Sequence, residues 1–206
     1  MDSEKESKTY REVKKETSHD TIVSSSSSFY LSVKGQIING LFPGRDNLYC
    51  KYCFYYGDDW QVISGQEENC SQIALKTSDS GFRSIWNLPI DVTFRSSNPF
   101  KWPSLVVSVY GSDFFGNDVV HGYGAAHVPS ISGHHERQIA AFVPKSSSLL
   151  NAFQTWFTGK RAEFLDSRIV AQGNDRSIVR VSTQGMVKVE MDIILKDFHK
   201  HGYKNK

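Results

Sequence analysis

Three cysteines, Cys50, Cys53 and Cys70, are the most reactive side chains in the sequence. The first two form a C-x-x-C pair, which in redox proteins opens a helix whose N-terminus stabilises a thiolate. Here the pair falls in the aromatic-rich run Leu48–Tyr56, which predicts a β-strand. Residues three apart on a strand point to opposite faces. We therefore expect neither a redox pair nor a metal site, and the odd cysteine count fits a reducing compartment.

Histidines and aspartates offer few converging metal ligands. His121 and His127 are six residues apart, which predicts a shared strand face with about 20 Å between them, too far for one ion. Four aspartates lie in loops that flank predicted strands: Asp58, Asp59, Asp113 and Asp118. Calcium needs several oxygen ligands at one point, and these loops lack a D-x-D pair. We expect Asp113 and Asp118 to cap turns, and the sequence predicts no metal and no cofactor.

Glycines Gly122 and Gly124 begin a run that resembles a dinucleotide fingerprint, but the third glycine is replaced by His127. The surrounding pattern is β, so these glycines favour a bulge or close strand packing. No G-x-S-x-G or H-E-x-x-H motif is present. We therefore expect a protein without catalytic residues.

The elements that position these residues are predicted to be short strands. The predicted strands are Phe29–Val33, Leu48–Tyr56, Ser71–Lys76, Ile85–Phe94, Leu105–Tyr110, Val119–Val128 and Ile139–Val143, followed by Ile178–Thr183 and Met186–Leu195 as a hairpin around Gln184-Gly185. Pro89 indicates an edge or a bulge, and His134-His135 is predicted to lie in a loop. In the last strand, apolar residues from Val187 to Leu195 alternate with charged ones, which predicts one buried face. This spacing favours an antiparallel β-sandwich.

A single helix is predicted in a late connection, from Ser147 to Thr158. Its apolar residues recur at helical spacing: Leu149, Leu150, Phe153, Trp156 and Phe157. This stripe could dock onto the sandwich or face a partner.

The remaining organisation follows from composition. We divide the 206 residues into a charged, serine-rich disordered tail (1–28), one domain (29–198) and a basic C-terminal tail (199–206). The formal charge of +2 and a pI near 8.3 do not favour a nucleic-acid partner. No apolar run approaches the roughly 18 residues of a membrane span. We expect a cytoplasmic protein.

A long motif between Trp86 and Pro129 is the most specific feature of the sequence. Its segments are Trp86–Phe94, Asn98–Pro103, Val109–Gly111, Phe115–Val120, Gly122–Gly124 and His127–Pro129, with further agreement in Leu48–Trp60, Trp156–Phe157 and Val170–Gly173. This pattern resembles the B9-domain family from about Phe29 to Tyr203. The resemblance implies an all-β, C2-like sandwich. It also implies a place at the cilium basal body and transition zone, within the cytoskeleton. The 1–28 extension departs from the compact form of the family.

The resemblance implies a non-catalytic structural adaptor. Its partners would be other B9-domain proteins and Meckel-syndrome and tectonic-like membrane proteins, in a complex that serves cilium assembly and controls entry of ciliary membrane proteins. Phe114 and Phe115, in a predicted loop, are candidate partner-binding anchors, although inward packing would serve them equally.

The alternative function is a peripheral phospholipid-binding C2-like module. Its candidate lipid contacts are basic: Lys160, Arg161, Lys200, Lys204 and Lys206. The basic residues of the tail are also typical of a solvated chain end.

Overall fold

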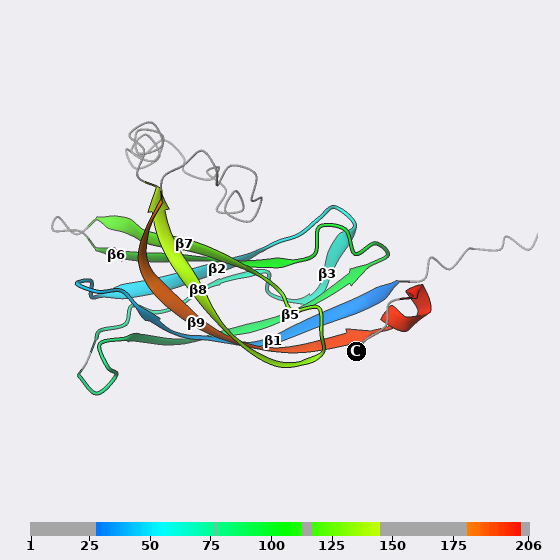
Figure 1. Ribbon diagram of the computed structural model, residues 1–206, viewed down its shortest axis with the longest axis horizontal. Coiled ribbons are helices and arrows are strands. Elements are labelled where there is room, and N and C mark those ends of the chain that lie inside the picture. The colour runs from blue at the N-terminus through cyan, green and yellow to red at the C-terminus, as the bar shows by residue number, and fades with distance from the viewer. Residues whose placement is uncertain (1–27, 77, 113–116, 145–180, 203–206) are drawn as a thin grey trace, which may run out of the picture.

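The computed structural model describes residues 28–76, 78–112, 117–144 and 181–202 of the chain (Figure 1). The regular elements within these residues are β1 (Phe29–Leu41), β2 (Leu48–Tyr55), β3 (Trp60–Gly65), β4 (Glu68–Cys70), β5 (Ser84–Ser96), β6 (Ser104–Ser112), β7 (Asp118–His127), β8 (Gly133–Pro144), β9 (Val181–Lys196) and the 3-10 helix η1 (Phe198–His201). The predicted helix from Ser147 to Thr158 lies outside the described residues.

All strand pairs are antiparallel, and the strand order is β3-β5-β1-β9-β8-β7-β6-β2-β4. The ladder is thinnest between β7 and β8, where Tyr123 and Phe142 form the single described pair. The sheet therefore curls into two layers, β3-β5-β1-β9-β8 and β7-β6-β2-β4 (Figure 1). The predicted antiparallel β-sandwich is confirmed.

The strands β3 and β4, which are consecutive in the chain, join the two layers at the side opposite the β7–β8 pair. β3 and β4 stand at opposite ends of the strand order, although only Gln66 and Glu67 separate them in the chain. The Gln66 amide donates to the carbonyl of Asp91 in one layer at 3.0 Å, and the Phe54 amide in the other layer donates to the carbonyl of Glu67 at 3.0 Å. This short connection ties the two sheet edges together.

The core lies between the layers and follows the period-two alternation of the strands. In β5 every second residue from Ser84 to Ser96 is buried. In β9 the predicted alternation is confirmed, with Val187, Val189, Met191 and Ile193 buried. Hydrogen bonds also join the layers, since Trp86 Nε1 donates to the carbonyl of Leu48 at 2.9 Å. Buried donors of this kind need such partners.

The predicted hairpin around Gln184-Gly185 is wrong, because β9 runs through both residues without a turn. Ala141 pairs with Gly185 and Phe142 with Thr183, so Gln184 is an extra residue in a bulge. A Cβ on Gly185 would lie 2.4 Å from the carbonyl oxygen of Leu41. The glycine therefore marks a close approach of two strands.

The placement of His134 and His135 in a loop is also wrong, since both belong to β8. From Gly133 to Gln138 most side chains of this strand are exposed. A strand without a buried face carries no alternation of apolar and polar residues, so the pattern could not reveal it.

Pro89 confirms the expectation of an edge and a nearby bulge. β3 pairs with β5 only as far as Val92, so Pro89 has no described partner strand on that side. Beside it, the β1–β5 register shifts between Ile37 and Asn39, and Asn87 has a φ of 45°. Such a position tolerates proline, which cannot donate a ladder hydrogen bond.

Candidate partner-binding surface

The described side chains with metal-binding or redox chemistry do not converge. Among the described residues, no three His, Cys, Asp or Glu side chains are grouped so as to hold a metal ion. Asp59 accepts a hydrogen bond from Asn98 Nδ2 at 2.9 Å, beyond the end of β2. Asp118 accepts one from the hydroxyl of Tyr49 at 3.1 Å, near the start of β2. These aspartates therefore lie at opposite ends of the sandwich.

The predicted placement of the C-x-x-C pair is confirmed, because Cys50 and Cys53 lie within β2 on opposite faces. Cys50 is buried in the core, and all three cysteines are free thiols. Burial raises the pKa of the Cys50 thiol far above its ordinary value, with the neighbouring Cys70 adding to the shift. A thiol of this kind is a weak nucleophile.

His121 and His127 do not share a face, which corrects the prediction from their spacing. Val109 pairs with Gly122 and Tyr110 with Val120, so His121 is the extra residue of a bulge. His121 is buried, and burial, with the charge of Arg45, lowers its pKa. His127 is exposed, and its Nδ1 lies 2.8 Å from Ser104 Oγ.

The structure does not describe the side chains of the residues predicted to contact a protein partner or lipid. Phe114, Phe115, Lys160, Arg161, Lys204 and Lys206 lie outside the described residues. Lys200 belongs to η1, and its side chain is not described. Their roles stay predictions. The described residues Ser112 and Asn117 flank the Phe114-Phe115 segment in the chain, and they lie at the end of β6 and just before β7.

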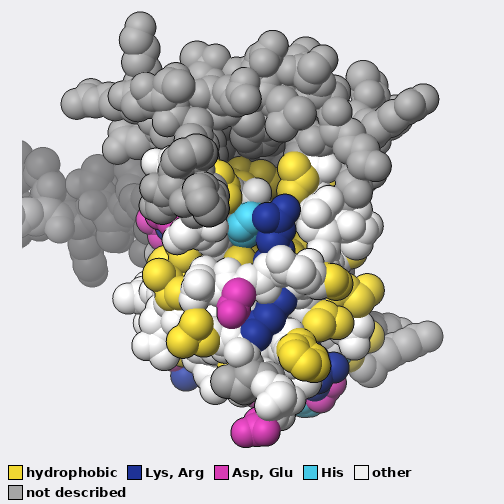
Figure 2. Space-filling view, turned by 90° about the vertical axis from the view of Figure 1, so that its left-hand side faces the viewer, with side chains coloured by type: hydrophobic (Ala, Val, Ile, Leu, Met, Phe, Trp, Pro, Cys, Tyr) yellow, Lys and Arg dark blue, Asp and Glu magenta, His cyan; other side chains and the backbone are white. Residues whose placement is uncertain are grey.

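The same end of the sandwich carries a concentration of exposed apolar side chains. We call it the apolar end surface: Leu41, Ile73, Leu75, Phe82, Ile85 and Met186, which are 38–67% exposed. Figure 2 shows this face, with hydrophobic side chains around a central group of charged ones. Contiguous exposed apolar patches on soluble domains mark interaction sites. Sequence reasoning missed these residues because they come from several segments.

Strand register brings three of these residues together. Leu41 of β1 pairs with Met186 of β9, and Asn39, two residues before Leu41, pairs with Ile85 of β5. All three apolar side chains thus share the outer face of one layer. Leu75 is held outward because its neighbours Ala74 and Lys76 form bridges to Leu48 and Ser84.

The charged side chains at this end are tied to the backbone. Asp46 Oδ1 accepts hydrogen bonds from the backbone amides of Lys76 and Asn47, each at 2.8 Å. These bonds lower the pKa of Asp46, the one to Lys76 most strongly. The ammonium of Lys76 donates to the carbonyl of Phe42. The loop after β1 and the segment before β5 are therefore fixed to each other, which holds the apolar residues in place.

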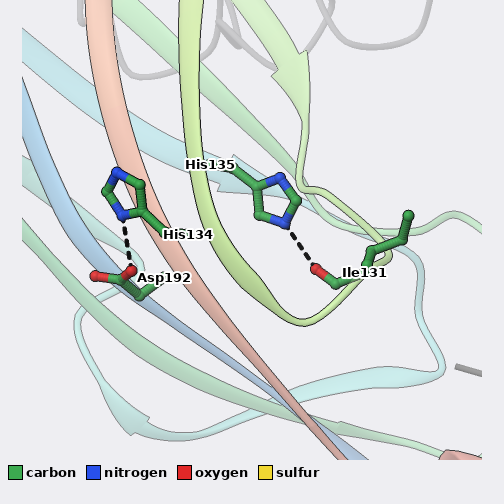
Figure 3. A network of polar contacts seen from close by, with 4 residues as sticks. All are labelled: Ile131, His134, His135 and Asp192. Carbon is green, nitrogen blue, oxygen red and sulfur yellow. Dashed lines mark hydrogen bonds and ion pairs between the residues drawn. The ribbon is translucent and has the colours of Figure 1, made fainter. Parts of the chain in front are cut away.

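Away from Leu41, Ile85 and Met186, the outer face of β8-β9-β1-β5 carries charges of both signs. His134 pairs with Asp192 at 2.9 Å, Lys34 with Asp91 at 3.5 Å, and Lys188 with Glu136 at 3.1 Å (Figure 3 shows the first). Opposite charges alternate across the four strands, so this face presents no single-sign field.

Comparison with known proteins identifies the class of this sandwich. A family model described as "Ciliary basal body-associated, B9 protein" (B9-C2) matches residues 31–194, and the chain belongs to this family. It is 52% identical over 179 residues to B9 domain-containing protein 1 of Mus musculus, covering 87% of this chain and 88% of that protein. The identity to B9 domain-containing protein 1 of Homo sapiens is also 52%, with the same coverage.

More distant similarity extends to a second kind of B9 protein. The chain is 31% identical over 173 residues to B9 domain-containing protein 2 of Homo sapiens, covering 82% of this chain and 95% of that protein. Among solved structures, a C2 domain of plant extended synaptotagmin 1 matches with a TM-score of 0.42 and 14% identity, over 82% of this chain and 95% of that one. No helix within the described residues has the length and apolar character to cross a membrane.

Proposed function

We propose that this ciliary B9 protein is a non-catalytic structural adaptor of the transition-zone complex, acting in cilium assembly and in control of ciliary membrane protein entry. Its partners are other B9-domain proteins and Meckel-syndrome and tectonic-like membrane proteins. It resides in the cytoplasm, at the basal body and transition zone. The observation that carries this proposal is the match of nearly the whole domain to a ciliary B9 family.

The surface chemistry supports binding by apolar contact. An exposed cluster that includes Leu75 and Phe82 gains free energy when a partner removes it from water, at roughly 25 cal/mol per Å² of apolar area. Its central charged residues would supply the polar part of an interface. No reaction site is needed for this function.

The phospholipid alternative rests on lysines that lie outside the described side chains. The described outer face of β8-β9-β1-β5 does not favour it, because Asp91, Asp192 and Glu136 stand beside its cations. Acidic side chains facing anionic lipid would oppose electrostatic attachment.

The proposal is tested by following the full chain in ciliated cells with Lys200, Lys204 and Lys206 replaced by Gln. We expect the variant to concentrate at the ciliary base, and to do so only while its B9 partners are present. Release into the cytosol, with the purified B9 complex still forming, would establish the lipid alternative.

A further inference from the structure

The strand β6 is buried on both of its faces, although it belongs to one layer of a two-layer sandwich. Leu105, Val107 and Val109 point into the core between the layers. Val106 and Ser108 alternate with them and therefore point away from the other layer. Even so, Val106 is 0% exposed and Ser108 is 5% exposed. The outward residues of the neighbouring strand β2 are, by contrast, exposed or half-buried.

Strand register joins these two side chains to others on the neighbouring strands. Residues that pair directly share a face of the sheet. We call this surface the outer β6 face. It consists of two rows that run across β2, β6 and β7: Cys53-Val106-Ala125 and Lys51-Ser108-Tyr123. Lys51 is the single charged residue of these six, so the face is largely apolar.

The buried part of the outer β6 face lies beside the end of β8. In the second row Lys51 is exposed, whereas Tyr123 on β7 is 7% exposed. Tyr123 pairs with Phe142 of β8, and β8 ends two residues later at Pro144 (Figure 1). The strand order places no described strand over this face. The burial of Val106 and Tyr123 therefore requires a cover from another part of the chain.

Residues 145–180 begin at this corner of the sheet and lie outside the described residues. The chain returns to the same place, because Val181 of β9 pairs with Pro144. Between these two points the sequence carries the apolar stripe that predicts one face of a helix: Leu149, Leu150, Phe153, Trp156 and Phe157. An apolar face and an apolar stripe of the same chain thus meet at one exit point.

We propose that residues 145–180 dock on the outer β6 face, with the apolar stripe against Val106 and Tyr123. An isolated helix of about 12 residues is only marginally stable in water, so an amphipathic helix of this length needs a surface for its apolar side. Docking makes the stripe a third layer of the domain and withdraws it from contact with a protein partner or lipid. This inference does not rest on the proposed adaptor function.

The thiol of Cys53 reports on the cover, because Cys53 is half-buried and pairs with Val106. The full chain is prepared in two backgrounds. Cys70→Ser leaves Cys53 as the accessible thiol, and Cys53→Ser leaves the exposed Cys70 of β4 as a control. Cys50 is buried in the core and should react only when the domain unfolds. The rate of labelling by a maleimide is followed by intact mass.

The stripe is broken by combining Phe153→Ser with Trp156→Ser. The matched variant combines Asn151→Ser with Gln154→Ser, which lie on the polar side of the predicted helix. We expect the labelling rate of Cys53 to rise about threefold or more in the stripe variant and to keep its wild-type value in the polar variant. Cys70 should label at one rate in all three proteins.

An equal rate for Cys53 in the wild-type chain and the stripe variant would overturn the proposal. A wild-type rate that falls as the protein is concentrated would also overturn it, because the cover would then come from a second copy of the chain.

Hydrogen exchange of the wild-type chain tests the docking without any substitution. The amides of an undocked helix of this length exchange nearly as fast as those of an unfolded chain. We expect the amides of residues 149–157 to exchange about a hundredfold more slowly than that. Exchange at the unfolded rate would overturn the proposal, and this measurement decides the question if labelling of Cys50 shows that the stripe variant unfolds.

Discussion

The glycine at position 35 gives a sharp test of the packing between β1 and β9. Gly35 has a φ of +153°, and a Cβ there would lie 2.1 Å from the carbonyl oxygen of Glu190. The left-handed conformation costs a non-glycine residue roughly 1–2 kcal/mol. Overpacking against a backbone atom costs roughly another 1–3 kcal/mol. After a gain of about 0.4–1 kcal/mol from the unfolded chain, Gly35→Ala should lower the free energy of unfolding by about 2–4 kcal/mol.

The matched control is Gly133→Ala. Gly133 has a φ of +126°, but a Cβ there would meet nothing within 4 Å. Only the conformational cost applies, so the loss should be about 1 kcal/mol or less. Urea unfolding of both variants measures the difference through the transition midpoint at a constant slope. Equal losses for the two variants would refute the close approach of β1 to Glu190.

Three further predictions concern other parts of the domain. The hydrogen bond to Asp192 raises the pKa of His134 above its ordinary value of 6.5. The His134–Asp192 pair therefore contributes stability that is complete below the pKa of His134 in the unfolded chain and is lost as pH rises through its pKa in the folded chain. An NMR titration should show that the pKa of His134 falls in Asp192→Asn. An unchanged pKa of His134 would contradict the pair. Gly124→Val would place a Cβ 2.6 Å from Ile139 Cγ2, so it should lower thermal stability, with partner binding falling only as the folded fraction falls; a stable variant without binding would instead indicate a direct contact. Removing residues 1–28 should leave the melting temperature unchanged, and a drop of many degrees would show that the tail docks.

Most of the fold could be predicted because its strands have one buried face. Alternating apolar residues predict β5 and β9, because each strand buries one face between the two layers. The first half of β8 could not be predicted, since its exposed side chains carry no such alternation. The sequence pattern predicts a turn at Gly185, because a glycine that permits close strand approach gives the same local pattern as a glycine in a hairpin.

The surfaces were harder to predict than the fold. Leu41, Ile85 and Met186 meet only through the strand register, and they are far apart in the sequence. The hydrogen bond from Trp60 Nε1 to the carbonyl of Phe100 joins residues 40 positions apart. Exposure and long-range backbone bonds are properties of the folded chain that a local pattern does not contain.

The most direct test of the adaptor account is to measure binding of the purified full chain to a purified second B9-domain protein at low and high salt, beside vesicles that contain anionic lipid. Apolar burial is not screened by salt, whereas electrostatic attachment to lipid is. We expect protein binding that changes little with salt and no retention on the vesicles. Binding to vesicles alone, lost as the salt is raised, would contradict the account.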